Sequence, residues 1–135
     1  MTDPTSDLTQ AFLARQMDPG AFHHAEHVQV AFDLLEAHDF IDASAIYARG
    51  LQAIAALAGV PEKFNLTIAY AFMSLIAERR AGMKGHGFAT FAEQNADVMS
   101  KAALAGWYAE SRLHSDLARE VFLMPQALVA QDDLA

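Results

Sequence analysis

The sequence contains no cysteine, and this absence excludes two kinds of structural support. Without thiols the chain can form neither disulfides nor zinc sites with thiolate ligands. At 135 residues it is long enough to build a hydrophobic core without such support. The sequence therefore predicts a single all-α domain over residues 1–125, followed by a loose C-terminal tail over residues 126–135.

Basic residues are also scarce. Nine Lys and Arg stand against seventeen Asp and Glu, which gives a formal net charge of −8. A protein that binds nucleic acid neutralises phosphates with a basic surface. The charge balance therefore predicts no nucleic-acid partner.

Long apolar runs are missing as well. No stretch approaches the roughly 20 apolar residues of a membrane span, and the N-terminal residues show no positive region followed by an apolar run. We expect no membrane partner and a cytoplasmic location. Apolar residues still make up 53% of the chain and charged residues only 19%, which is compatible with a homodimer that shares apolar surface.

Several catalytic signatures are absent. The chain has no Gly-x-Ser-x-Gly motif, no phosphate-binding loop with Lys-Ser/Thr and no dinucleotide fingerprint. The Glu-x-x-His pairs of helical di-iron proteins are also missing. The sequence thus identifies neither a reaction class nor a cofactor, and whether the protein is an enzyme stays open.

What is present is helical periodicity from end to end. We predict a compact bundle of five to seven helices. The residues expected at the beginnings of these helices are Ser6 or Thr5, Asp42, Pro61, Thr90, Ser100 and Ser115. The expected helices cover residues 6–13, 24–37, 43–58, 61–80, 90–95, 101–108 and 116–122.

The most informative segment is the beginning of the second predicted helix. His24 and His27 share a helical stripe with Leu34. Because Leu34 must face the core, the two histidines are expected to point inward or toward a cleft.

Three interpretations of this pair stay open. Imidazole is a common metal ligand, but a catalytic metal needs a third ligand, for which Glu78 and His86 are candidates. Alternatively, His24 caps the helix while His27 is a buried histidine that hydrogen-bonds a neighbouring helix. The third interpretation is a pocket for an organic ligand.

A second polar stripe runs along the fourth predicted helix, at spacings of three and four residues: Thr67, Tyr70, Ser74 and Glu78. It is either the solvent face of that helix or the wall of a pocket shared with the histidine helix. In the latter case each buried polar group would need a partner.

Trp107 and Tyr108 are followed by Arg112 and Arg119. Aromatic rings and arginine can hold a planar or carboxylate ligand. Core packing, with an arginine at a helix end, explains the same residues.

The combined pattern resembles a family of small uncharacterised all-helical bacterial proteins. The similarity covers residues 20–126 and rests on three main motifs: Phe22-x-His24-x-x-His27-Val28, Lys63-Phe64-Asn65-x-Thr67-Ile68 and Ala118-Arg119-x-x-Phe122-x-x-Pro125. Further matches are Glu78-Arg79, Asn95, Asp97 and Trp107-Tyr108.

The resemblance implies one ligand-binding site formed by His24, His27, Asn65, Thr67, Tyr108 and Arg119. The family pattern has Tyr-His where this chain has Phe64-Asn65. Asparagine is a poor metal ligand but can donate and accept hydrogen bonds, which favours an organic ligand over a metal.

We therefore predict a helical protein that binds a small organic molecule near His24 and His27. Either histidine is a candidate general base near neutral pH, with Arg119 as the anchor of an anionic group and Tyr108 as a hydrogen-bonding partner. The alternatives are a metal-dependent enzyme that uses His24 and His27, and a non-enzymatic homo-oligomeric interaction domain.

Overall fold

The computed structural model describes residues 6–125 and shows only helices and their connections within that range. The all-α prediction is confirmed, although three short 3₁₀ helices (η1–η3) bring the number of helical elements above the expected five to seven. In chain order the elements are α1 (Asp7–Leu13), η1 (Pro19–Ala21), α2 (His24–Ala37), α3 (Phe40–Leu57), η2 (Pro61–Lys63), α4 (Leu66–Ala81), α5 (Phe88–Gln94), η3 (Lys101–Gly106), α6 (Glu110–Leu113) and α7 (Asp116–Glu120). The predicted tail over residues 126–135 lies outside the described residues.

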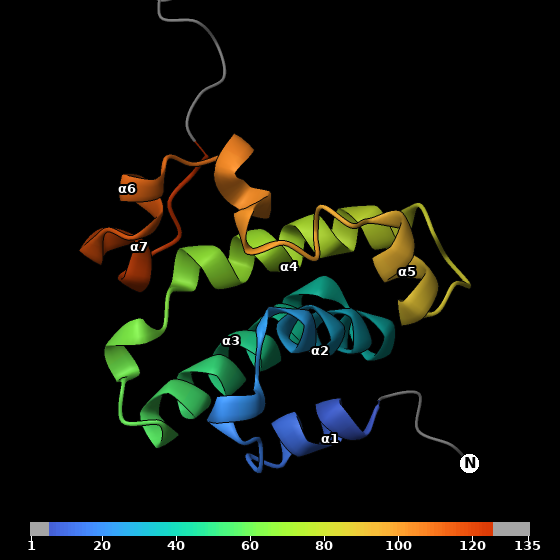
Figure 1. Cartoon of the computed structure of the whole chain (residues 1–135), viewed down its shortest axis with the longest axis horizontal. Coiled ribbons are helices and arrows are strands. Elements are labelled where there is room, and N and C mark those ends of the chain that lie inside the picture. The colour runs from blue at the N-terminus through green and yellow to red at the C-terminus, as the bar shows by residue number, and fades with distance from the viewer. Residues whose placement is uncertain (1–5, 126–135) are drawn as a thin grey trace, which may run out of the picture.

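The core is organised around α2. This helix packs against α1, α3 and α4, and α7 packs against the first half of α4 (Figure 1). Val30 and Leu34 of α2 are fully buried, as are Met73 and Ile76 of α4. Within the described residues, none of the helices is both long enough and apolar enough to cross a membrane.

Helix α1 is held against the core by hydrogen bonds to a buried carboxylate and by close packing against α3. The Asp33 carboxylate accepts hydrogen bonds from the Ser6 hydroxyl at 2.7 Å and from the Thr9 hydroxyl at 2.8 Å. Phe12 lies so close to Gly50 that a Cβ at that position would be 2.1 Å from the ring. Because Gly50 has no side chain, α1 and α3 can pack closely at this point.

The bounds of α2 agree with the prediction, and Ser6 caps α1 as expected. Helix α3 begins three residues earlier than predicted, because Asp39 rather than Asp42 is its N-cap. The Asp39 carboxylate accepts a hydrogen bond from the Asp42 backbone N–H at 2.8 Å. This early start leaves the apolar Phe40 and Ile41 exposed.

Two other predicted starts are wrong. Pro61 begins the separate turn η2, and α4 begins only after Asn65, whose side chain accepts a hydrogen bond from the Ile68 N–H at 2.9 Å. Thr90 does not cap α5, because the helix already begins at Phe88 after the N-cap Gly87. Thr90 lies inside its first turn.

Near the C-terminus, Ser100 and Ser115 cap η3 and α7 as predicted. The first of these elements is a 3₁₀ helix that ends at Gly106, two residues before the predicted end, and α7 ends at Glu120 rather than near Phe122. Helix α6 was not predicted. After α7 the chain continues without helix through residues 121–125, and hydrogen bonds to Thr67 join this segment to the beginning of α4.

Candidate functional site

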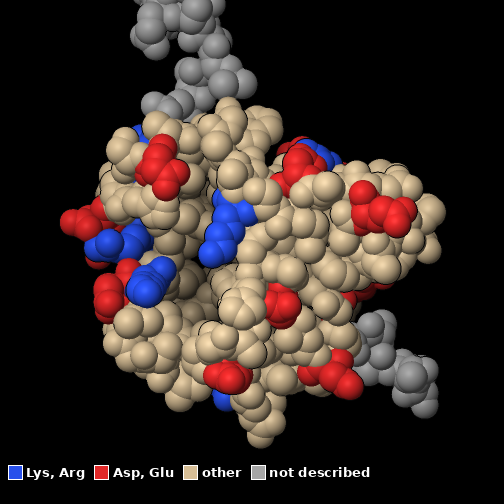
Figure 2. Space-filling view, in the orientation of Figure 1, with Lys and Arg blue, Asp and Glu red and all other residues tan. Residues whose placement is uncertain are grey.

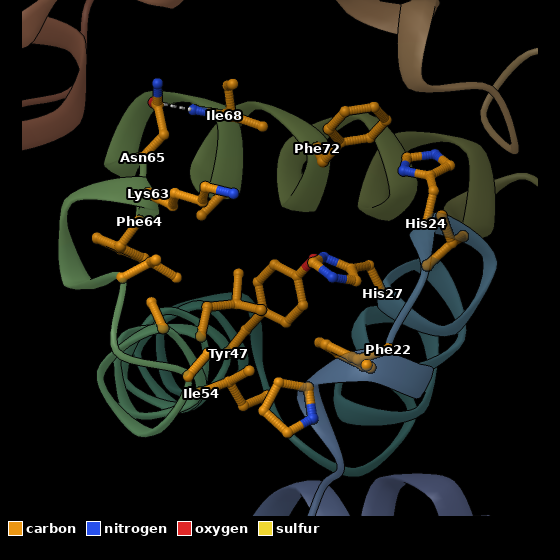
Figure 3. A pocket seen from close by; sticks show the side chains of 18 of the residues that line it. Phe22, His24, His27, Tyr47, Ile54, Lys63, Phe64, Asn65, Ile68 and Phe72 are labelled. Atoms are coloured by element: carbon orange, nitrogen blue, oxygen red, sulfur yellow. Dashed lines mark hydrogen bonds between the residues drawn. The ribbon is translucent and has the colours of Figure 1, made fainter.

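A cavity of about 640 Å³ lies between α2, α3 and α4. The 3₁₀ helices η1 and η2 contribute Pro19 and Lys63 to its wall, and the segments next to them contribute Phe22 and Phe64. Figure 3 shows side chains from all three α-helices pointing into the same space. This volume is in the range of pockets that hold small organic molecules.

Most of the cavity wall is apolar. Phe64 and Phe72 contribute rings, and aliphatic side chains such as Ile54 and Ile68 cover much of the remainder. The polar groups among the lining side chains are few and come from different elements: His24 and His27 on α2, Tyr47 on α3, Lys63 on η2 and Asn65 before α4. An apolar wall with a few separated polar groups is typical of a ligand site.

His24 is held in place by its surroundings. Its Nε2 donates a hydrogen bond to the Val98 carbonyl at 3.1 Å, and its ring packs edge-on against Phe72 with centroids 5.0 Å apart. The interpretation of His24 as a helix cap is wrong, because His23 is the N-cap and donates its N–H to Glu26. His24 instead joins α2 to the segment that follows α5.

That segment is itself fixed to α4. The Arg79 guanidinium donates to the Asn95 side chain at 3.0 Å and to both carboxylate oxygens of Asp97, at 3.0 and 2.7 Å. This pairing holds the pKa of the Asp97 carboxyl below its usual range. Val98, the partner of His24, follows directly in the chain.

His27 lies deeper in the cavity wall. Its ring stacks on Phe22 with centroids 4.0 Å apart. Burial, followed by the proximity of His24, lowers the pKa of His27 to about 4. The imidazole is therefore neutral at pH 7, where it can donate one hydrogen bond and accept another.

Tyr47 completes the polar part of the inner wall. Its side chain extends from α3 into the cavity toward His27 (Figure 3). The residue is only 3% exposed, and burial raises the pKa of its phenol, so the hydroxyl stays protonated. Among residues 6–125 this hydroxyl has no hydrogen-bond partner, although it is not one of the fully buried unpaired atoms.

Asn65 contributes to the cavity wall but has a structural role as well. Besides capping α4, its Nδ2 donates to the Leu113 carbonyl at 2.6 Å. One amide thus joins the beginning of α4 to the end of α6.

Thr67 and Tyr108 do not line the cavity, contrary to the single site implied by the family resemblance. The Thr67 hydroxyl, fully buried, donates to the Val121 carbonyl at 2.7 Å and accepts from the Leu123 N–H at 3.0 Å. The Tyr108 hydroxyl donates to the Leu123 carbonyl at 2.8 Å. Both side chains hold the segment after α7 against the rest of the protein.

Arg119 is also outside the cavity. Its guanidinium pairs with Asp116 one turn earlier on α7, at the surface. The expectation that Arg119 anchors an anionic ligand beside His24 and His27 is therefore not met. Arg112, in turn, donates to the Met124 carbonyl at 2.9 Å.

The polar stripe of α4 faces the C-terminal segments rather than the histidine helix. Ser74 and Glu78 line a second, smaller hollow of about 140 Å³ together with Trp107 and Tyr108. Of the two interpretations of this stripe, the pocket wall shared with α2 is therefore not observed.

No group of three histidine, aspartate or glutamate side chains that could hold a metal ion occurs in the described part of the chain. Neither Glu78 nor His86 joins His24 and His27, and Nε2 of His24 already donates to a carbonyl. The histidine pair therefore lacks the third protein ligand that a catalytic metal site needs.

Sequence reasoning missed Tyr47 and Lys63 as cavity residues. Tyr47 belongs to the apolar stripe of α3, where it is the one member with a hydroxyl, and Lys63 stands two residues before Asn65. Both residues belong to patterns that the sequence shows, the apolar stripe of α3 and the Lys63-Phe64-Asn65 motif. The sequence does not show that α3 turns this stripe toward α2.

No family model, curated protein or solved structure matches this chain. The resemblance to small bacterial helical proteins therefore stays a prediction.

Proposed function

We propose that this protein binds a small organic molecule in the cavity between α2, α3 and α4. The observation that carries the proposal is the cavity itself, about 640 Å³ in volume and lined mainly by apolar side chains. Tyr47 supports the proposal, because its side chain extends into the cavity and its hydroxyl can donate a hydrogen bond to a ligand there.

Binding is better supported than general-base catalysis. An efficient general base has a pKa near the working pH, whereas the pKa of His27 is lowered to about 4. We therefore assign His27 the role of a neutral hydrogen-bonding group, with no proton transfer attached to it. His24 would mainly hold the wall in place through Val98.

The test is a titration with the neutral fluorescent probe N-phenyl-1-naphthylamine, whose emission rises in an apolar environment. Ala55 lines the cavity, and the neighbouring Ala56 is exposed and does not. Ala55→Trp should fill part of the space and abolish probe binding. Ala56→Trp adds the same side chain to the same helix and should bind the probe like the wild type.

Thermal melting of both variants confirms that each is folded before the titration is interpreted. Loss of probe binding in Ala55→Trp alone supports the proposal. Equal binding in all three proteins would place the probe elsewhere, and no binding in the wild type would contradict the proposal directly.

A further inference from the structure

The charge around the cavity has the opposite sign to the charge of the chain. The protein carries a net charge of −8, with seventeen acidic residues. None of the residues that line the cavity is acidic, and Lys63 is the lysine among them. A cationic ligand would therefore find no counter-charge at the cavity wall.

Lys63 occupies a favourable position for an anion. It ends η2, and its side chain extends from the turn into the cavity beside Phe64 and Asn65 (Figure 3). Among residues 6–125 its ammonium group has neither an ion pair nor a hydrogen bond with a side chain. The charge is thus available to a ligand.

A second cation lies near the same space. The charge of Lys101, at the beginning of η3, contributes to the lowered pKa of His27. Figure 2 shows Lys and Arg side chains at the hollow between α3 and α4, with Asp and Glu side chains beside several of them. Glu26 on α2 acts on the pKa of His27 in the opposite direction and more strongly than Lys101. The unpaired positive charge at the cavity wall is therefore that of Lys63, and a charge of this sign favours negatively charged ligands.

The inside of the cavity is uncharged. His27 and Tyr47 are neutral at pH 7, and the surrounding wall is apolar. A charged group is stable only near the mouth, because transfer of an ion into the apolar interior without a partner is costly. The ligand should accordingly have an apolar part and a charge at one end.

We propose that the ligand is an amphipathic carboxylic acid, with its carboxylate at Lys63 and its apolar body between α2, α3 and α4. This inference rests on the proposed function and adds the chemical class of the ligand. Tyr47 and His27 would serve any neutral polar group on that apolar body.

Three ten-carbon compounds test the charge preference: decanoate, decan-1-ol and decylamine. Each is added to the complex with N-phenyl-1-naphthylamine, and its concentration for half displacement of the probe is measured near neutral pH. Decanoate should displace the probe at a concentration about threefold to tenfold below that of decan-1-ol, and decylamine should be the weakest. High salt should reduce these differences.

Lys63→Gln should remove most of the advantage that decanoate has over decan-1-ol. Lys63→Glu should go further and favour decylamine over decanoate. Lys84→Gln is the matched control, because Lys84 is an exposed lysine that does not line the cavity and its substitution changes the net charge equally. It should behave like the wild type.

The outcomes separate the two proposals. If the neutral probe binds but the three compounds displace it equally, or if Lys63→Gln and Lys84→Gln have the same effect, the acid preference is wrong and the cavity remains a binding site. If the neutral probe does not bind at all, both proposals fail.

Discussion

The imidazole of His27 stacks on the phenyl ring of Phe22, with centroids 4.0 Å apart and ring planes 23° from parallel. The contact lies at the point where the chain leaves η1 and enters α2, and both rings line the cavity. Stacking of this kind excludes water from one face of the imidazole. A neutral histidine is therefore built into the wall of the site.

The first prediction concerns pH. The folded pKa of His27, about 4, is below its value of 6.5 in the unfolded chain, so the unfolded state binds the proton more strongly. The contribution of His27 to stability is complete above about pH 6.5, is lost as the pH falls toward 4, and amounts to as much as about 3 kcal/mol. Urea unfolding across this range measures it.

His27→Gln is the comparison for that experiment, because glutamine keeps a polar group and cannot titrate. The difference between wild type and variant isolates His27 from the other groups that titrate in the range. A free energy of unfolding that falls equally in both proteins would show that His27 is not buried in its neutral form.

A second prediction concerns Tyr47. In the ligand-free protein its hydroxyl has no partner among the described residues, so Tyr47→Phe should change the free energy of unfolding by no more than about 0.5 kcal/mol. If the hydroxyl bonds a polar ligand, the same variant should weaken binding of that ligand severalfold. Chemical denaturation measures the free energy of unfolding, and a ligand titration measures the affinity. A large loss of stability in Tyr47→Phe would show that the hydroxyl has a hydrogen-bond partner within the protein.

The helical part of the fold could be predicted where the signal is local. The bounds of α2 follow from its apolar period, and Ser6, Ser100 and Ser115 cap the elements they were expected to cap. Thr90 fits a capping box equally well but lies inside a helix. Gly87 offers an earlier start that buries Phe91, and tertiary packing decides between the two.

The site was predictable only in part. His24, His27 and Asn65 do meet at one cavity, but Thr67, Tyr108 and Arg119 do not. A threonine that binds a ligand and one that binds a returning backbone segment look alike in sequence. The path of residues 121–125 along α4 distinguishes them, and that path depends on how α7 packs.

Thr67 gives a third prediction. Thr67→Val keeps the shape of the side chain but leaves the Val121 carbonyl and the Leu123 N–H without their partner. We expect a loss of about 1–3 kcal/mol in the free energy of unfolding and no change in ligand binding. Thr90→Val, in α5, is the control and should cost little. Weakened probe binding in a folded Thr67→Val protein would instead indicate that Thr67 is part of the ligand-binding site.

The fourth prediction tests the contact between α1 and α3. A Cβ at Gly50 would lie 2.1 Å from the Phe12 ring, which is fully buried. Gly50→Ala should therefore destabilise the protein by at least about 1 kcal/mol, although alanine favours a helix. Gly106→Ala should not destabilise the protein, because no atom lies within 4 Å of the new Cβ. Thermal melting compares them, and a stabilised Gly50→Ala protein would contradict this packing.

The most direct test of the account is to locate the bound probe by NMR with methyl-labelled isoleucine, leucine and valine. On addition of N-phenyl-1-naphthylamine, the methyl signals of Ile54, Ile68 and Ile76, which line the cavity, should shift. The exposed methyl groups of Ile41 and Leu117, outside the cavity, should not. Shifts confined to Ile41 or Leu117, or no shift at all, would contradict a binding cavity between α2, α3 and α4.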